Sequence, residues 1–212
     1  MIEFTDGTGW LNARIRGVKK AYKIPTTKEI FNIAIDIGAN VGAFPIVNHN
    51  KFKRIICIEP SEYSFNECIK NNNRFDNVEV HNLAVSKTDG DVIKLRKCLG
   101  ENTSGNASTV AHESWSTDEF ELIKTISYKG LFKKFGIEKI DYLKIDCEGG
   151  EYDFLIDQDL SKIDYLGIEI HVLLNEKLKI LEDYIKKDFD IIYETGNGIT
   201  INKEYTFKNK KI

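Results

Sequence analysis

Short apolar runs alternate with amphipathic segments along most of the chain. The runs are four to six residues long and rich in Ile, Val and Leu, at 33–37, 54–58, 78–83, 142–145 and 166–170. Near-continuous apolarity without polar alternation is typical of parallel strands that are covered on both faces. Strands that alternate with helices predict βαβ units and a doubly wound sheet.

Three segments between or after these runs have the periodicity of amphipathic helices. Their apolar positions are Phe65, Cys68 and Ile69; Leu131, Phe132 and Phe135; and Leu178, Leu181, Tyr184 and Ile185. Ser64 and Glu67 have the spacing of a capping box at the start of the first helix. Gly136 suits the C′ position that ends the second helix.

The C-terminal part of the chain has a different pattern. In "FDIIYETGNGITINKEYTF", two strand-like runs are joined through Gly196, Asn197 and Gly198. Such a glycine-rich turn between apolar runs is a strong hairpin signal. A mostly parallel sheet is therefore expected to finish with an antiparallel pair.

The stretch from Lys87 to Thr125 interrupts the alternation. It contains one predicted strand, Val92–Leu95, followed by the polar segment "GENTSGNASTVAHESWSTDEF". Long segments without periodicity are usually functional or mobile. The Asn, Ser and Thr side chains suit hydroxylated ligands, and Trp115 can stack on a sugar face. Residues 96–125 are therefore interpreted as an acceptor-binding loop, with a plain surface loop as the alternative.

Length and composition favour an ordinary globular domain. The chain has 212 residues, 42% of them hydrophobic, and a formal net charge of −3. We expect one domain over 33–212, preceded by an N-terminal segment over 1–32 that either caps the cleft or pads the sheet. The charge balance argues against a nucleic-acid partner, because phosphate binding usually requires a basic face.

The cellular setting is predicted from cysteine usage and from hydropathy. The four cysteines form no CxxC pair, which favours reduced thiols in a cytoplasmic protein. The first ten residues lack the basic start and the apolar core of a signal peptide. No apolar run approaches 18 residues, so no membrane helix is expected.

The turn in "IAIDIGANVGAF" is the first candidate binding element. Asp36 ends the strand run, and Gly38, Asn40 and Gly42 follow before a helix. Asn40 stands where a dinucleotide fingerprint has its middle glycine, so the turn is poorly suited to a diphosphate. A ligand with an amino-acid end suits it better, with Asp36 near an ammonium and backbone N–H groups near a carboxylate.

Glu59 supplies the second part of this pattern. It ends the second strand run, 21 residues after Gly38. An acid at that place can accept hydrogen bonds from both hydroxyls of a ribose, although a lone acid after a strand is more often a solvated strand end. Together with the turn, Glu59 indicates a nucleoside joined to an amino acid, which is S-adenosylmethionine or its product.

Five blocks of the sequence resemble the successive signatures of the FkbM family of S-adenosylmethionine-dependent methyltransferases. They are "AIDIGANVGAF", "IEPSEYSFNECIKNNN", "NVEVHNLAVS", "IDYLKIDCEGGEYDFL" and "GIEIH", and they span residues 33–171. The resemblance implies the Rossmann-like class I methyltransferase fold. That fold has a mostly parallel seven-stranded sheet with a C-terminal antiparallel hairpin and helices on both faces.

The resemblance also assigns residues to S-adenosylmethionine as the cofactor. The residues expected around its methionine part are Asp36, Gly38, Asn40 and Gly42. Glu59 is expected at the ribose, with Pro60 and Ser61 beside the adenosine. The turn over 83–86, which includes Ala84 and Ser86, is expected to border the adenine.

Acceptor chemistry is expected at "KIDCEGGEYDF" and at the next strand end. Asp146 and His171 each close a strand at the carboxyl edge, where ligands bind in such sheets. Glu148 and Glu151 follow Asp146 at the start of a helix, where carboxylates also gain about 0.3–1 kcal/mol from the helix dipole alone. The candidate catalytic residues are Asp146, His171 and Glu148, with His171 or Asp146 as the general base.

A divalent ion would be an alternative to a general base. Asp146, with Glu169 or His171, has suitable ligand atoms for such an ion. No spacing motif marks a metal site, and none is assigned from the sequence.

The favoured function is O-methylation of a hydroxyl on a sugar, glycan or related metabolite, a substrate class that the resemblance implies. Methylation of nucleic acid or protein is a rival. The [DNS]-P-P-[YFW] turn of many base-methylating enzymes is absent, because Asp146, Cys147, Glu148 and Gly149 stand there. Asn40 opposes an NAD-dependent oxidoreductase. An inactive S-adenosylmethionine-binding module is opposed by the intact turn, Glu59 and Asp146.

The expected partner is a small-molecule or glycan acceptor, with no nucleic acid and no membrane, and the oligomeric state stays open.

Overall fold

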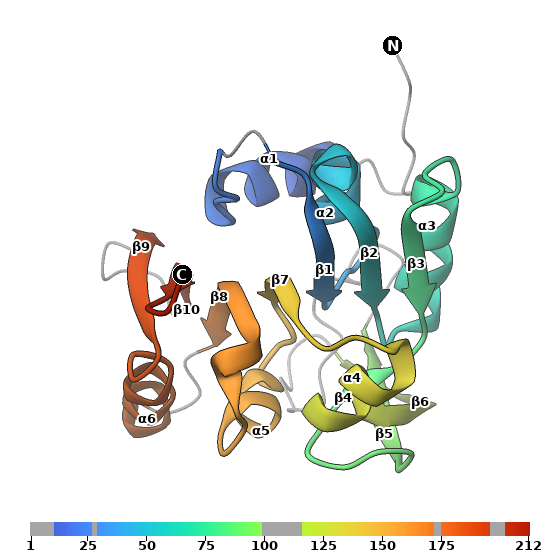
Figure 1. Ribbon diagram of the computed structural model, residues 1–212. Helices are drawn as coiled ribbons and strands as arrows, with labels where there is room; N and C mark the ends of the chain where they lie inside the picture. Colours follow the sequence, from blue (N-terminus) through green and yellow to red (C-terminus); the bar gives the residue numbers. More distant parts are fainter. Residues whose placement is uncertain (1–10, 27–28, 99–115, 172–174, 196–201) are drawn as a thin grey trace.

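The computed structural model describes residues 11–26, 29–98, 116–171, 175–195 and 202–212 of the chain. Seven strands form the main sheet in the order β3-β2-β1-β7-β8-β10-β9 (Figure 1). Their bounds are β1 Phe31–Ile37, β2 Phe52–Ile58, β3 Val78–His81, β7 Ile140–Ile145, β8 Ile163–His171, β9 Phe189–Thr195 and β10 Asn202–Asn209.

The pairing confirms the predicted sheet. β1, β2, β3, β7 and β8 are parallel to one another. β10 is antiparallel to both β8 and β9. The strand runs predicted from the sequence all fall within or overlap these strands, and the C-terminal antiparallel pair is present. The turn predicted at 196–198 lies outside the described residues.

Helices cover both faces of this sheet, as predicted. They are α1 Leu11–Ala21, α2 Ala43–Asn48, α3 Glu62–Asn72, α4 Tyr128–Phe135, α5 Glu151–Leu155 and α6 Asn175–Ile185, with 3₁₀ turns η1 His49–Lys51 and η3 Leu160–Lys162. Alternate side chains of β1 enter different clusters. Ile35 and Ile37 pack with residues of α4, α5 and α6, whereas Ala34 packs with residues of α1, α2 and α3. From Ala34 to Ile37 both sets of strand positions are buried, and all of them except Asp36 are apolar.

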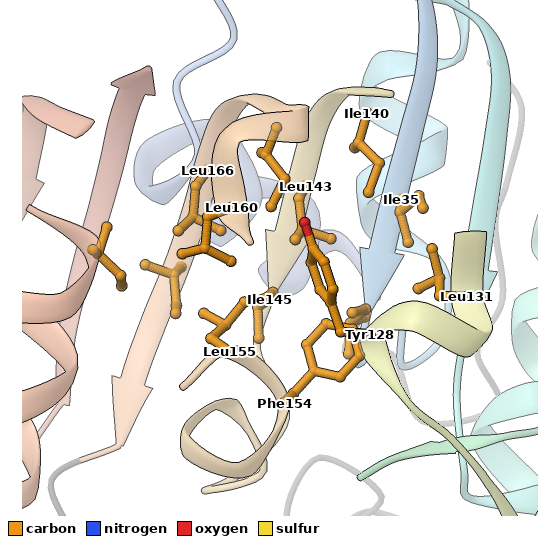
Figure 2. Packing of buried hydrophobic residues seen from close by; sticks show 14 of the residues in the cluster. Ile35, Tyr128, Leu131, Ile140, Leu143, Ile145, Phe154, Leu155, Leu160 and Leu166 are labelled. Carbon is orange, nitrogen blue, oxygen red and sulfur yellow. The ribbon is translucent and has the colours of Figure 1, made fainter. Parts of the chain in front are cut away.

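Figure 2 shows the cluster on the α4–α5 side of the sheet, where Ile35, Leu143 and Ile145 meet Leu131 of α4 and Phe154 of α5. These side chains are almost wholly buried. At roughly 1.5–3 kcal/mol for each buried side chain of this size, the cluster is a main source of the stability that fixes the strand ends.

Two of the predicted helix details are confirmed and one is wrong. Gly136 ends α4 in the left-handed conformation, and its N–H donates to Phe132. Leu181 and Ile185 of α6 are fully buried. The capping box of Ser64 and Glu67 does not form, because α3 already begins at Glu62, directly after the loop that leaves β2. Ser64 is buried inside the helix, and Glu67 pairs with Lys70 at 2.5 Å.

A second, three-stranded sheet lies beyond the carboxyl ends of β1, β2 and β3 (Figure 1). It consists of β4 Ala84–Val85, β5 Val92–Cys98 and β6 Ser116–Ile126. The prediction of an irregular loop over 96–125 is wrong for its described ends, which are strand. The strand β6 is not recognisable from the apolar pattern, because only one of its faces is buried and an apolar residue also lies on the other. Leu122 is 71% exposed, whereas Ile123 is 4% exposed. His112 and Trp115 lie outside the described residues.

The described part of the N-terminal segment packs onto the domain. Leu11 of α1 is buried against Val41 and Ala43, and Tyr22 is buried in the cluster that contains Ala34. Among the described helices, none is both long enough and apolar enough to cross a membrane.

Candidate active site

Two turns with left-handed residues lie against each other at the carboxyl edge of the sheet. After β1, Gly38, Asn40 and Gly42 have φ values of 71°, 51° and 84°. After β7, Glu148 and Gly149 have φ values of 51° and 100°. A Cβ atom on Gly38 would lie 1.7 Å from the carbonyl oxygen of Asp146, so only glycine allows this approach. Left-handed residues other than glycine are costly and gather at functional sites.

The N–H groups of the first turn are satisfied within the protein. Gly38 and Ala39 donate to the carbonyl of Ile58, and Gly42 donates to that of Ala39. Asn40 donates to Glu59, and its own side-chain oxygen accepts from the N–H of Val41. The expectation that these amides hold a ligand carboxylate therefore does not fit this conformation, because none of the five has a free donor.

Asp36 also has a partner inside the fold. Its carboxylate is fully buried, and Oδ1 lies 3.0 Å from Nζ of Lys144 on β7. Lys144 donates to the carbonyls of Gly38 at 2.7 Å and Ile37 at 3.3 Å. Asp36 was expected near a ligand ammonium; the structure shows it beside the ammonium of Lys144. The sequence signal that was missed is a lysine within the apolar run 142–145.

Lys144 links the two turns electrostatically. Its Nζ lies 3.8 Å from Oδ2 of Asp146, and the hydroxyl of Tyr22 donates to the same oxygen at 3.4 Å. Burial alone would lower the pKa of Lys144, but the carboxylates of Asp36 and Asp146 outweigh it and hold that pKa above its ordinary value. The lysine therefore remains a cation between two acids.

Glu59 is a buried acid beside the first turn. It is 6% exposed, and its two carboxylate oxygens accept from the N–H groups of Asn40 at 2.8 Å and Ser61 at 3.0 Å. Burial disfavours the charge and raises the pKa of Glu59 to about 7, although the two backbone hydrogen bonds oppose this shift. Asn82 fixes the same loop by donating to the carbonyls of Glu59 and Pro60.

A pocket opens between these strand ends and the small sheet. Most of the residues that line it are apolar: Ile37, Gly38, Ile58, Pro60, Leu83, Ala84, Val85, Leu95, Cys147 and Gly150. Three of the residues predicted for the cofactor line it, namely Gly38, Pro60 and Ala84. Ser86 lies just beyond, and its N–H donates to Ile126.

The apolar residues of the pocket suit a flat ring, and the buried acid Glu59 precedes the lining residue Pro60. Asp36, Asn40, Gly42 and Glu59 do not line the pocket; they support the turn that forms one of its edges.

The predicted acceptor residues converge at the ends of β7 and β8. Nε2 of His171 lies 3.2 Å from Glu148 Oε2, 3.9 Å from Glu169 Oε1 and 4.0 Å from Asp146 Oδ1. Nδ1 faces the opposite way, 3.4 Å from Glu151 Oε1, and makes no hydrogen bond. Asp146, Glu148, Glu151, Glu169 and His171 are called the acidic cluster below.

Glu151 connects the turn after β7 to the end of β8 on the buried side of the cluster. It is fully buried, and its carboxylate accepts from the backbone N–H groups of His171 at 2.8 Å and Gly149 at 2.9 Å. Burial alone would lower the pKa of His171, but the neighbouring carboxylates of Glu148 and Glu151 raise it to about 11. The imidazole is thus a cation among carboxylates.

Comparisons with known proteins identify the family and the fold. Residues 36–194 match the sequence model of a family described as the methyltransferase FkbM domain. No curated protein matches the chain in sequence. The similar solved structures include an FkbM methyltransferase from Methylobacillus flagellatus KT, with 16% identity and a TM-score of 0.52 over 84% of this chain and 43% of that one.

Two further solved structures have the same fold. An rRNA methylase from Streptococcus thermophilus has 14% identity and a TM-score of 0.52, over 85% of this chain and 88% of its own. M. capricolum TrmK, in complex with S-adenosyl-homocysteine, has 16% identity and a TM-score of 0.50, over 93% of this chain and 68% of its own. At these identities the likeness concerns the fold alone.

Proposed function

The chain belongs to the FkbM family of S-adenosylmethionine-dependent methyltransferases, and on that premise we propose that it binds S-adenosylmethionine and methylates a hydroxyl of a sugar, glycan or related metabolite. The observation that carries the proposal is the contiguity of two sites. Cys147 lines the pocket, and the preceding residue, Asp146, belongs to the acidic cluster. A donor in the pocket and an acceptor at the cluster would therefore be neighbours.

The cofactor would be held by residues that are already in place. Gly38, Pro60 and the turn over 83–85 would enclose the adenosine. Glu59 precedes Pro60 and does not line the pocket, so it would reach the ribose hydroxyls only through a small shift of its loop, with the lone pairs that Asn40 and Ser61 leave free. When bound, S-adenosylmethionine supplies an electrophilic methyl group on a sulfonium. The protein's main contribution is alignment of the acceptor oxygen, which can be worth roughly 7–11 kcal/mol.

Of the two candidate bases, Asp146 is the residue we assign to the acceptor proton, because the raised pKa of His171 keeps its imidazole protonated. The Asp146 side chain is 31% exposed, whereas that of His171 is 10% exposed and lies behind the carboxylates. Asp146 therefore offers an oxygen to a hydroxyl that approaches from solvent. Tyr22 and Lys144 hold its other oxygen in place.

The charge of the cluster bears on the choice of acceptor. Four carboxylates at one strand edge repel a polyanion, whereas hydroxyl groups can donate hydrogen bonds to them. This favours a small-molecule or glycan acceptor over nucleic acid. The free thiols of Cys57, Cys68 and Cys147 fit a cytoplasmic setting.

The proposed function is tested by calorimetry with S-adenosyl-homocysteine, followed by single-turnover methyl transfer to sugars, glycans and RNA. We expect binding, transfer to a hydroxylated acceptor, and a loss of about 100-fold in rate for Asp146→Asn. Asp153→Asn is the matched control, because that side chain is 70% exposed and pairs with Lys87.

Three outcomes would count against the proposal. Absence of binding would refute the cofactor, transfer to RNA alone would refute the acceptor class, and binding without transfer to any acceptor would favour a binding module.

The affinity for S-adenosyl-homocysteine is expected to fall as the pH drops below about 7. In the free protein, burial raises the pKa of Glu59 from its ordinary value of 4.5 to about 7. The folded state therefore holds this proton more tightly than the unfolded state does, and its contribution to stability is lost as the pH rises from 4.5 to 7. Ribose hydroxyls stabilise the ionised form, so the ligand must displace that proton at lower pH. The Kd should rise by at most about tenfold for each pH unit below 7, because one proton is displaced on binding.

Calorimetry between pH 5.5 and 8, roughly the range that brackets this pKa, measures the effect. Glu59→Gln removes the titrating group, and its affinity should be lower and nearly independent of pH. A wild-type profile as flat as that of Glu59→Gln would contradict the role of Glu59.

A further inference from the structure

Three donor atoms of different side chains converge at the ends of β7 and β8. Asp146, Glu169 and His171 each offer one atom, and these atoms all lie within 4.8 Å of one another. Across the part of the chain that the structure describes, no other group of three such side chains meets this condition. From this convergence we infer that Asp146, Glu169 and His171 bind a divalent metal cation.

The spacing suits a shared cation. Nε2 of His171 is 4.0 Å from Asp146 Oδ1 and 3.9 Å from Glu169 Oε1. At metal-to-ligand distances of about 2.0–2.2 Å, two donors of one ion stand about 3 Å apart when adjacent and at most about 4.4 Å apart when opposite. Both gaps are too long for a direct hydrogen bond, and the side chains would draw together by up to about 1 Å around an ion.

His171 distinguishes this group from an ordinary acidic surface patch. The residue is 8% exposed, so the imidazole is buried, and its Nε2 points to the carboxylates of Asp146 and Glu169. Its other nitrogen, Nδ1, has no hydrogen-bond partner and lies 3.4 Å from the fully buried Glu151. Metal-bound histidines commonly have a carboxylate at the second ring nitrogen, which orients the ring.

The local charge also favours a cation. Besides the two proposed carboxylate ligands, Glu148 lies 3.2 Å from His171 Nε2. The nearest lysine, Lys144, is already held by Asp36 and two carbonyls. A divalent ion would replace the proton on His171 Nε2 and offset more of this negative charge than the proton does.

The ligand set indicates the class of ion. Carboxylate oxygens suit Mg²⁺ and Mn²⁺, and an imidazole adds affinity for first-row transition metals, so Mn²⁺ is the appropriate probe. Resting on the proposed function, such an ion would coordinate the acceptor hydroxyl and make its proton more acidic. Asp146 would then act as a ligand of the ion.

Mn²⁺ binding to the full chain is measured by electron paramagnetic resonance of the free ion, with Mg²⁺ and Zn²⁺ as competitors. We expect one site, and a loss of affinity of at least about tenfold in both Glu169→Gln and His171→Ala. His81→Ala is the matched control, because His81 ends β3 as His171 ends β8 but, among the described residues, forms an ion pair with the single carboxylate of Glu79. Circular dichroism checks that each variant is folded.

The outcomes separate the site from the function. Absence of Mn²⁺ binding in the wild type, or equal binding in Glu169→Gln and the wild type, would overturn the metal site even if methyl transfer is observed. Binding that is lost in both variants but accompanied by no methyl transfer would support the metal site and count against the proposed function. Asp146→Asn is not used here, because either role of Asp146 predicts lower activity.

Discussion

Gly38→Ala is expected to lower the free energy of unfolding by roughly 3–5 kcal/mol. The new Cβ would lie 1.7 Å from the carbonyl oxygen of Asp146 and 2.7 Å from its carbonyl carbon. Both atoms belong to the backbone, so no side chain can rotate away. Overpacking of this kind costs about 1–3 kcal/mol or more, and the left-handed φ of 71° adds about 1–2 kcal/mol. Urea unfolding followed by far-ultraviolet circular dichroism measures the loss.

Gly90→Ala separates the two contributions. Gly90 has a φ of 78°, close to that of Gly38, but a Cβ there would meet no atom within 4 Å. The substitution should therefore cost only the backbone part, about 1–2 kcal/mol. Equal losses in the two variants would show that the contact with Asp146 has no energetic weight.

Lys144→Met is expected to destabilise the protein by about 3–5 kcal/mol, because it leaves the fully buried Asp36 without a counter-charge. Methionine fills similar space, so the loss reports charge and hydrogen bonding more than packing. Affinity for S-adenosyl-homocysteine should also fall, since Lys144 donates to the carbonyl of Gly38 in the turn that borders the pocket.

The control for this prediction is a lysine at the other end of the same strand region. Lys139 is 53% exposed and pairs with Asp164 at 2.7 Å, so Lys139→Met should cost less than about 1 kcal/mol. In the Lys144→Met background, Asp36→Asn should restore part of the stability by removing the buried charge. A loss in Lys144→Met no larger than in Lys139→Met would contradict the importance of the buried pair.

The main sheet could be predicted because each of its central strands has an apolar pattern within its own short segment. A parallel strand covered on both faces is mostly apolar, and the sequence displays this at 33–37 and 54–58, where Asp36 and Arg54 are the only charged residues. The strand β6 could not be found in the same way, since Phe120 and Leu122 are exposed and the polar Glu121 lies between them. A one-sided strand next to a polar segment resembles a loop when only periodicity is considered.

The site was predicted to a similar extent. Asp146, Glu169 and His171 were expected to lie near one another, because the carboxyl ends of adjacent parallel strands meet at one edge of the sheet. The structure brings one donor atom of each within 4.8 Å of the others. The partner of Asp36 was not predicted, since Lys144 is distant in sequence and joins it only through the pairing of β1 with β7. Hydrogen bonds within the turn after β1 likewise depend on Glu59 and Ile58 of β2, which no local pattern reveals.

The contact between Gly38 and Asp146 has a consequence for protein engineering. The turn beside the pocket and the strand end that carries Asp146 touch through their backbones, and Lys144 contacts both sides of that junction. A chimera made to transfer acceptor specificity from one relative to another would therefore have to include both β1 and β7, each with the turn that follows it. Grafting the segment around Asp146 alone would bring a foreign backbone against Gly38, and the recipient would lose its cofactor turn together with its old substrate.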